Sequence, residues 1–149
     1  MEGVIGTEPW TWRVPALEQS TAGMDFVEAF SQRYAMYPSS SAASAYSIVY
    51  QWADAAQRAK SLDSEALIKA LEGHRYQLLK GPQEWRPFDH QNLQTVYAVK
   101  VKPRAEVLKD PLKQDYFEIV ERLDASQAAP SLAEWQAERR AAGQPLTLQ

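Results

Sequence analysis

The chain has 149 residues, a formal net charge of −3 at pH 7 and no cysteine. Hydrophobic residues make up 45% and charged residues 23% of it, which is typical of a globular protein and excludes wholesale disorder. The acidic balance provides no basic field for nucleic acid, and the lack of cysteine excludes disulfides, thiolate nucleophiles and zinc–thiolate sites.

The N-terminal segment 3–7, Gly-Val-Ile-Gly-Thr, is a short apolar run that predicts a buried strand. The first ten residues lack a basic region followed by an apolar core, so we do not expect them to be a signal peptide. No apolar run approaches the roughly 18 residues of a membrane span, so we expect no direct membrane insertion. The loop after the strand carries Trp10 and Trp12, which either line a pocket or cover the edge of a core.

Three helices are predicted next. Residues 24–36 carry aromatic side chains at helical spacing, and Pro38 is expected to end this helix. Residues 39–41, all serine, are a natural N-cap region for a second helix over 42–60. Asp63 is the predicted N-cap of a third helix that stops at Gly73. The predicted inward stripe of the second helix is Ala42, Ala45, Tyr46, Val49, Trp52 or Ala53, and Ala56.

The pattern changes after Gly81-Pro82, which predicts a turn. Residues 95–102 alternate between apolar and polar positions, so they predict a strand with one buried face. A unit this small needs cover from elsewhere in the protein. Residues 112–123 then predict an amphipathic helix, and a capping box at 131–134 predicts a last helix to about residue 142.

Asp89 and His90 are the most suggestive pair for catalysis, as an orienting carboxylate and a base. Adjacent side chains on an extended chain point in opposite directions, so hydrogen bonds that tie this turn to a neighbouring segment are the alternative. His74 and His90 do not have the spacing of a metal site, and no nucleophile elbow or phosphate-binding glycine motif is present. The sequence therefore predicts no enzyme, no metal and no cofactor.

Four features, taken in order along the chain, resemble the C-terminal half of the type I periplasmic substrate-binding proteins, in the Leu/Ile/Val-binding branch that serves ABC transporters. They are Glu2-Gly3-Val4-Ile5-Gly6-Thr7; Phe26, Phe30 and Tyr34 followed by Pro38; Ala42–Tyr46 with the Ala-rich helix and the helix after Asp63; and Gly81-Pro82 with Arg86, Asp89, His90 and Gln91 before a strand.

The resemblance implies an α/β fold in which the helices belong to one lobe and the strands to the other. The change from helical to period-2 spacing between Gly73 and Thr95 agrees with it. We expect residues 1–108 to be the C-terminal part of a leucine-binding-protein-like domain and 109–149 a charged helical tail. Family members are more than twice as long, so the chain is expected to be a fragment that lacks much of the first lobe and the export signal.

In this family a ligand closes two lobes around a cleft. The resemblance implies that Glu2, beside Gly3, receives the ammonium of an amino acid, that Ser41 borders the side-chain pocket and that Trp10 borders the opening. The implied function is capture of a branched-chain or other amino acid, or an amide, in the periplasm, with the permease of an ABC transporter as partner.

Three alternatives remain open: an enzyme built on the same lobes, which lacks a catalytic set here; a ligand-sensing or regulatory domain; and a gene fragment without function. The upstream gene sequence would separate transport from sensing. The helices at 24–71 have apolar stripes and almost no partner sheet in this chain. We therefore expect the isolated chain to unfold with poor cooperativity or to associate.

Overall fold

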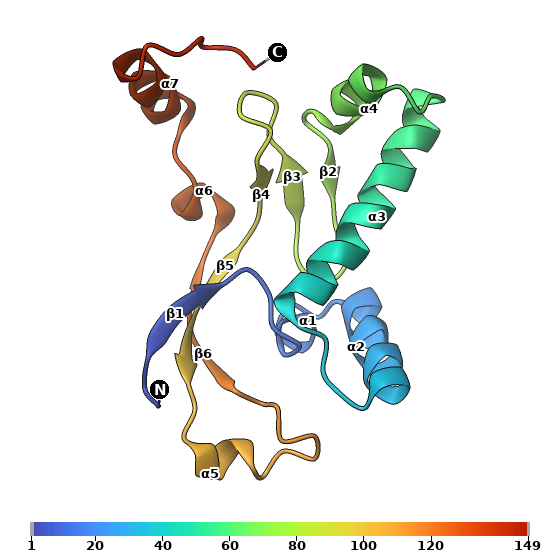
Figure 1. The fold of residues 1–149 in the computed structure, drawn as a ribbon, viewed down its shortest axis with the longest axis vertical. Helices are drawn as coiled ribbons and strands as arrows, with labels where there is room; N and C mark the ends of the chain where they lie inside the picture. Colours follow the sequence, from blue (N-terminus) through green and yellow to red (C-terminus); the bar gives the residue numbers. More distant parts are fainter. Residues whose placement is uncertain (1, 149) are drawn as a thin grey trace.

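The computed structural model describes residues 2–148 (Figure 1). Its first sheet, sheet A, contains β1 (Ile5–Glu8), β5 (Val96–Val101) and β6 (Phe117–Leu123) in the order β1-β5-β6, with both pairs antiparallel. The strand predicted at 95–102 is confirmed as the central strand. Tyr97 and Val99 on its apolar face are buried, as the alternation predicts.

The strand predicted near the N-terminus is present, but it is not buried. β1 lies at the edge of sheet A, and Ile5 is 68% exposed, so the prediction of a buried strand is wrong. The short apolar run required a strand partner, which β5 provides, but no described element covers the outer side of Ile5.

The helix predicted over 112–123 is also wrong, because residues 117–123 form β6. Ala98 pairs with Glu121 and Val99 with Ile119, so Val120 is an extra residue in a β-bulge. The extra residue interrupts the two-residue alternation of apolar positions. The resulting spacing imitates a helix, and only pairing with β5 distinguishes the two.

The helical unit contains α1 (Val14–Leu17), α2 (Thr21–Tyr34), α3 (Ser40–Ala59) and α4 (Ser64–Leu71). The predicted caps are confirmed, since Ser39 accepts a hydrogen bond from the amide of Ala42 and Asp63 from that of Ala66. α2 ends at Tyr34, before Pro38, and its C-cap Ala35 has a left-handed φ of 52°. Gly73 follows α4 with a φ of 71°, a conformation that favours glycine.

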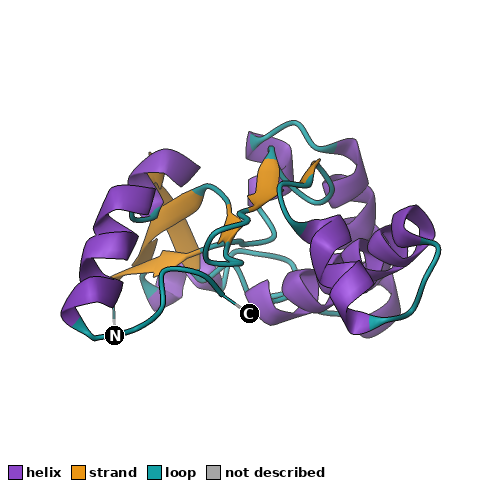
Figure 2. Cartoon of the chain, turned by 90° about the horizontal axis from the view of Figure 1, so that it is seen from above, coloured by secondary structure: helices purple, strands orange, loops and turns teal. Residues whose placement is uncertain are grey.

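A second sheet, sheet B, lies beside α3 and consists of β2 (Arg75–Tyr76), β3 (Gln83–Trp85) and β4 (Asn92–Leu93) in antiparallel order (Figure 1). Trp85 donates its indole N–H to the side-chain oxygen of Gln51 over 3.3 Å, which joins sheet B to α3. Viewed from above, helices lie on both sides of the molecule with strands between them (Figure 2). The predicted α/β class is confirmed.

The face of α3 that points inward differs from the predicted stripe. Ala43, Gln51 and Ala55 are buried, whereas Val49 and Trp52 are more than half exposed. The small residues do permit the close approach that the sequence predicts, but at other positions of the helix.

The C-terminal part adds α5 (Arg104–Val107), α6 (Ala125–Ala128) and α7 (Leu132–Ala141). The capping box predicted for the last helix is confirmed, with Ser131 and Glu134 each bonding the other's backbone N–H. Trp135 of α7 packs on Phe88 with ring centroids 5.3 Å apart, so this segment reaches from sheet A to the end of sheet B. The division of the chain at residue 108 stays a prediction.

The Asp89–His90 turn matches the non-catalytic alternative. Asp89 forms a buried ion pair with Arg86, and His90 contacts the carboxylate of Glu72 at the end of α4 over 2.9 Å. Arg86 also donates to the backbone oxygen of Pro130 over 2.6 Å. The pair therefore ties the turn to two neighbouring segments, as that interpretation expects.

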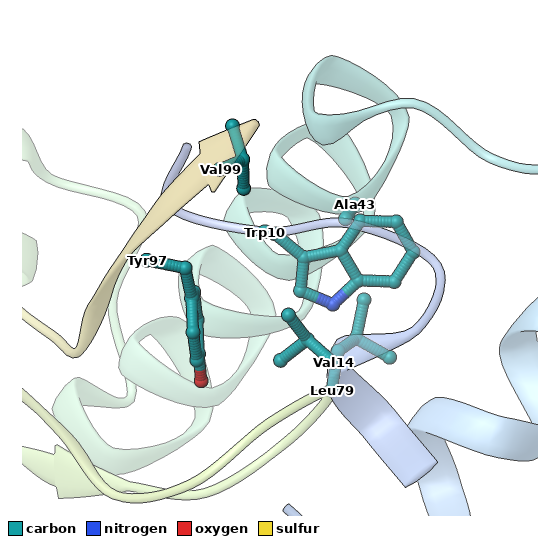
Figure 3. Packing of buried hydrophobic residues seen from close by; sticks show 6 residues of the cluster. All are labelled: Trp10, Val14, Ala43, Leu79, Tyr97 and Val99. Atoms are coloured by element: carbon teal, nitrogen blue, oxygen red, sulfur yellow. The ribbon is translucent and has the colours of Figure 1, made fainter. Parts of the chain in front are cut away.

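The main hydrophobic core lies where sheet A meets the helical unit (Figure 3). Figure 3 shows the indole of Trp10 enclosed by side chains that come from widely separated segments. The buried cluster consists of Trp10, Val14, Ala43, Leu79, Tyr97 and Val99.

Candidate functional site

A cavity of about 430 Å³ lies between sheet A and the N-terminus of α3. Three stretches of chain form its walls: the loop after β1, the segment between α2 and α3, and the segment that leads into β6. Its lining residues are Glu8, Trp10, Thr11, Trp12, Tyr37, Pro38, Ser39, Ser40, Ser41, Gln114, Asp115, Tyr116 and Phe117.

One wall of the cavity is aromatic. Trp10 is only 4% exposed, while Trp12 stacks on Tyr37 with ring centroids 3.9 Å apart. Tyr37 donates its hydroxyl to Asp110 over 2.9 Å, and its backbone N–H to Gln114 over 3.0 Å. Burial, followed by the hydrogen bond to Asp110, raises the pKa of Tyr37 to about 12. Tyr37 is therefore a neutral, fixed part of this wall at physiological pH.

The first turn of α3 also lines the cavity. Ser39 caps the helix, and Ser40 and Ser41 follow as its first residues. The first amide groups of a helix have no partner within the helix, and the aligned peptide dipoles place partial positive charge there. Three serine hydroxyls and this partial charge make the wall suited to a carboxylate or another hydrogen-bond acceptor.

Asp115 lines the cavity and is only 6% exposed. Its carboxylate pairs with Arg13, whose Nε donates over 2.7 Å, and with the ammonium of Lys102 over 2.5 Å. Burial alone would raise the pKa of Asp115, but the hydrogen bonds from these two cations outweigh it and hold that pKa below its usual value. Asp115 is thus ionised and already neutralised, whereas Glu8 is a half-buried carboxylate in the cavity lining.

The cavity brings together two of the residues that the sequence nominates, Trp10 and Ser41. Trp10 lines the cavity and also belongs to the core, so it combines the two positions that the sequence offers as alternatives. Glu2 and Gly3 are exposed and lie beyond the other end of β1, where the N–H of Gly3 donates to the backbone oxygen of Val101. They do not line this cavity, and their ligand-binding role stays a prediction.

Sequence reasoning missed Asp115, Arg13 and Lys102, which meet across 102 and 13 residues of sequence. No local motif joins them, because the contact depends on β6 pairing with β5. A weak signal was present in the acidic residue just before the β6 segment, but the helical interpretation of that segment concealed it.

Among residues 2–148, no helix is long and apolar enough to cross a membrane. Within the same range, no three histidine or acidic side chains are grouped so that they could hold a metal ion.

Comparison with known families identifies residues 1–106 as a match to the periplasmic binding protein family. The chain belongs to this family. The matched range contains most of the cavity, whereas Gln114–Phe117 lie outside it. A comparison with curated protein sequences found no match.

Solved structures agree with the family assignment. A periplasmic binding protein from Burkholderia mallei is 25% identical, with a TM-score of 0.74. The alignment covers 89% of this chain and 33% of that protein. An ABC-type branched-chain amino acid transporter protein from Rhodopseudomonas palustris is 29% identical with a TM-score of 0.67, with 85% and 32% covered. The chain therefore spans about a third of the length of these relatives.

A third similar structure contains a bound ligand. It is a solute-binding protein of an ABC transporter from Rhodopseudomonas palustris in complex with 3,4-dihydroxybenzoic acid, with 21% identity and a TM-score of 0.64. The alignment covers 83% of this chain and 31% of that chain. At this identity the likeness concerns the fold alone.

Proposed function

We propose that this chain is part of the solute-binding component of an ABC transporter and that its cavity binds an amino acid or a related small polar ligand. The observation that carries the proposal is that sheet A and the helical unit both contribute residues to one cavity. This cavity combines an aromatic wall with the N-terminus of a long helix. Clefts that bind small molecules join apolar walls with a few placed polar groups in this way.

The proposed pose follows from the charges of an amino acid. Its carboxylate lies against the first turn of α3, where Ser40, Ser41 and the free amides can donate to it. Its side chain packs on Trp10 and Tyr37. Its ammonium needs a carboxylate, and Glu8 is the one in the lining that Arg13 and Lys102 do not neutralise.

Glu2 remains the competing ammonium acceptor, a role that rests on the resemblance of Glu2-Gly3-Val4 to the family pattern. In the intact protein, Glu2 can accept the ammonium only if closure of the lobes brings its side chain to the ligand from its position before β1. Periplasmic location and a partnership with the transporter's membrane subunits belong to the same proposal, and family membership supports them.

Calorimetric titration of the intact protein with leucine, isoleucine, valine and their amides tests the proposal. We expect Glu8→Gln to weaken binding of leucine by tenfold or more, which corresponds to about 1.4 kcal/mol, and Glu2→Gln to act as the matched control. A tenfold loss in Glu2→Gln alone would move the ammonium site to Glu2. Binding of 3,4-dihydroxybenzoate without binding of any amino acid would contradict the proposed ligand class.

A further inference from the structure

A buried lysine lies outside the ligand cavity, at the place where the chain passes between sheet A and the rest of the molecule. Lys80 is only 3% exposed. Its ammonium donates to the backbone oxygen of Thr95 over 2.8 Å and also to that of Pro9. Charge-assisted hydrogen bonds of this kind are about twice as strong as neutral ones.

The two carbonyl groups have special positions in the fold. Pro9 comes directly after β1, where the chain leaves sheet A, and Thr95 comes directly before β5, where it returns. All of α1–α4 and sheet B lie between these two points in the sequence. One ammonium therefore joins the exit and the return of the chain.

A lysine at this buried position costs free energy, so stability alone does not explain why Lys80 is there. Burial lowers the pKa of Lys80 to about 8, and the carboxylate of Glu18 opposes this effect. Glu18 is itself engaged, because it accepts the hydroxyl of Tyr97 over 2.9 Å and pairs with Arg122 over 3.4 Å. A buried charge without a close counter-ion costs free energy, so an apolar residue of similar size would serve packing better.

One of the two segments that Lys80 joins also contributes to the ligand cavity. Trp10 follows Pro9 directly and lines the cavity, and Phe117 of β6 lines it from sheet A. A shift of the segment that follows β1 relative to the helical unit therefore moves Trp10, and with it one side of the ligand cavity.

We propose that Lys80 is a positioning residue that fixes the orientation of sheet A relative to the helical unit, and so sets the width of the ligand cavity. The effect on ligand binding rests on the function proposed above. The clamp itself does not, and it can be measured without any ligand.

The test compares Lys80→Met, which keeps the length of the side chain, with Lys100→Met, which removes an exposed lysine from the same sheet. Amide hydrogen exchange is measured along the intact protein. We expect exchange at residues 10–12 and 96–97 to become at least tenfold faster in Lys80→Met only, with α3 unchanged. Unchanged exchange in these segments, or equal acceleration in α3, would overturn the proposal.

A second measurement needs no variant. Carbon-13 shifts of the Pro9 and Thr95 carbonyls should titrate together with a midpoint near the pKa of about 8. The groups that face Lys80 are Glu18, Tyr97 and, through Glu18, Arg122. Because the folded pKa is below the ordinary 10.5, global stability should rise with pH between these values while the ammonium clamp is lost. Carbonyl shifts that stay flat from below the pKa of about 8 to above the ordinary value of 10.5 would exclude the clamp.

Ligand titration then separates the two proposals. If leucine binds the intact protein, Lys80→Met should weaken it at least fivefold and Lys100→Met should not. If exchange changes as expected and no amino acid binds, the proposed function fails and the clamp stands. If leucine binds equally to both variants while exchange is also unchanged, the clamp fails and the function stands.

Discussion

The core around Trp10 and the outer face of α3 are both built from large apolar side chains, but only the first is covered. Trp10 is 4% exposed and Val14 is fully buried. On the outer face of α3, by contrast, Val49 is 64% exposed and Trp52 is 51% exposed. The two surfaces lie on the same chain and differ in where the rest of the chain passes.

The core is covered because several segments meet at one point. The loop after β1, α1, α3, the segment at Leu79 and β5 each contribute a side chain. Within residues 2–148, no comparable set of segments crosses the outer face of α3. The comparison teaches that an apolar stripe indicates a face that needs cover. The stripe does not say which segment supplies the cover, or whether this chain contains it.

Leu79→Ala tests the covered side of the comparison and should have the largest effect. Leu79 is almost fully buried, and its removal leaves a cavity that the surrounding segments cannot all close. We expect the free energy of unfolding to fall by about 2–5 kcal/mol. Urea denaturation followed by tryptophan fluorescence measures it. A loss below about 1 kcal/mol would mean that the core is looser than these contacts indicate.

The same substitution on both surfaces sharpens the comparison directly. Val14→Ala removes buried carbon atoms and should cost about 2 kcal/mol, at about 0.8 kcal/mol for each CH₂ plus a cavity term. Val49→Ala should change stability by no more than about 0.5 kcal/mol, because Val49 is mostly exposed. Both values come from matched thermal and urea unfolding. Equal costs would show that the outer face of α3 is covered in solution.

Gly23→Ala tests how closely the helical unit approaches the core. A Cβ at Gly23 would lie 2.3 Å from the backbone oxygen of Leu79 and 2.8 Å from Cβ of Pro15. Overpacking of this kind costs about 1–3 kcal/mol, from which about 1 kcal/mol of helix propensity is recovered.

Gly6→Ala is the control for that variant, because a Cβ there meets nothing within 4 Å. We expect Gly23→Ala to lower the melting temperature and Gly6→Ala to leave it nearly unchanged. A melting temperature of Gly23→Ala equal to that of the parent protein would show that α2 can move away from Leu79 at no cost.

Much of the helical part could be predicted from sequence because its signals are local. The sequence predicts an N-cap region at 39–41, an N-cap at Asp63 and a capping box that begins at Ser131. Ser39, Asp63 and Ser131 each accept the hydrogen bond of an N-cap from an amide three residues ahead. The alternation in β5 was equally informative, because its period of two identifies Tyr97 and Val99 as the residues of one face, and that face is buried. Order and spacing of such motifs were enough to indicate the family that residues 1–106 match.

The remaining features depend on contacts between distant residues. The bulge at Val120 exists only because β6 pairs with β5, so its sequence alone imitates a helix. The sequence nominated Trp10 and Ser41 separately, and the tertiary structure brought them into one cavity.

Arg13 reaches Asp115 across 102 residues, and Lys80 reaches Pro9 across 71. A hydrogen bond within a helix cap is set by a few backbone angles, so the local sequence determines it. These longer contacts form only when separate segments have packed, so the order of residues in the chain alone does not reveal them.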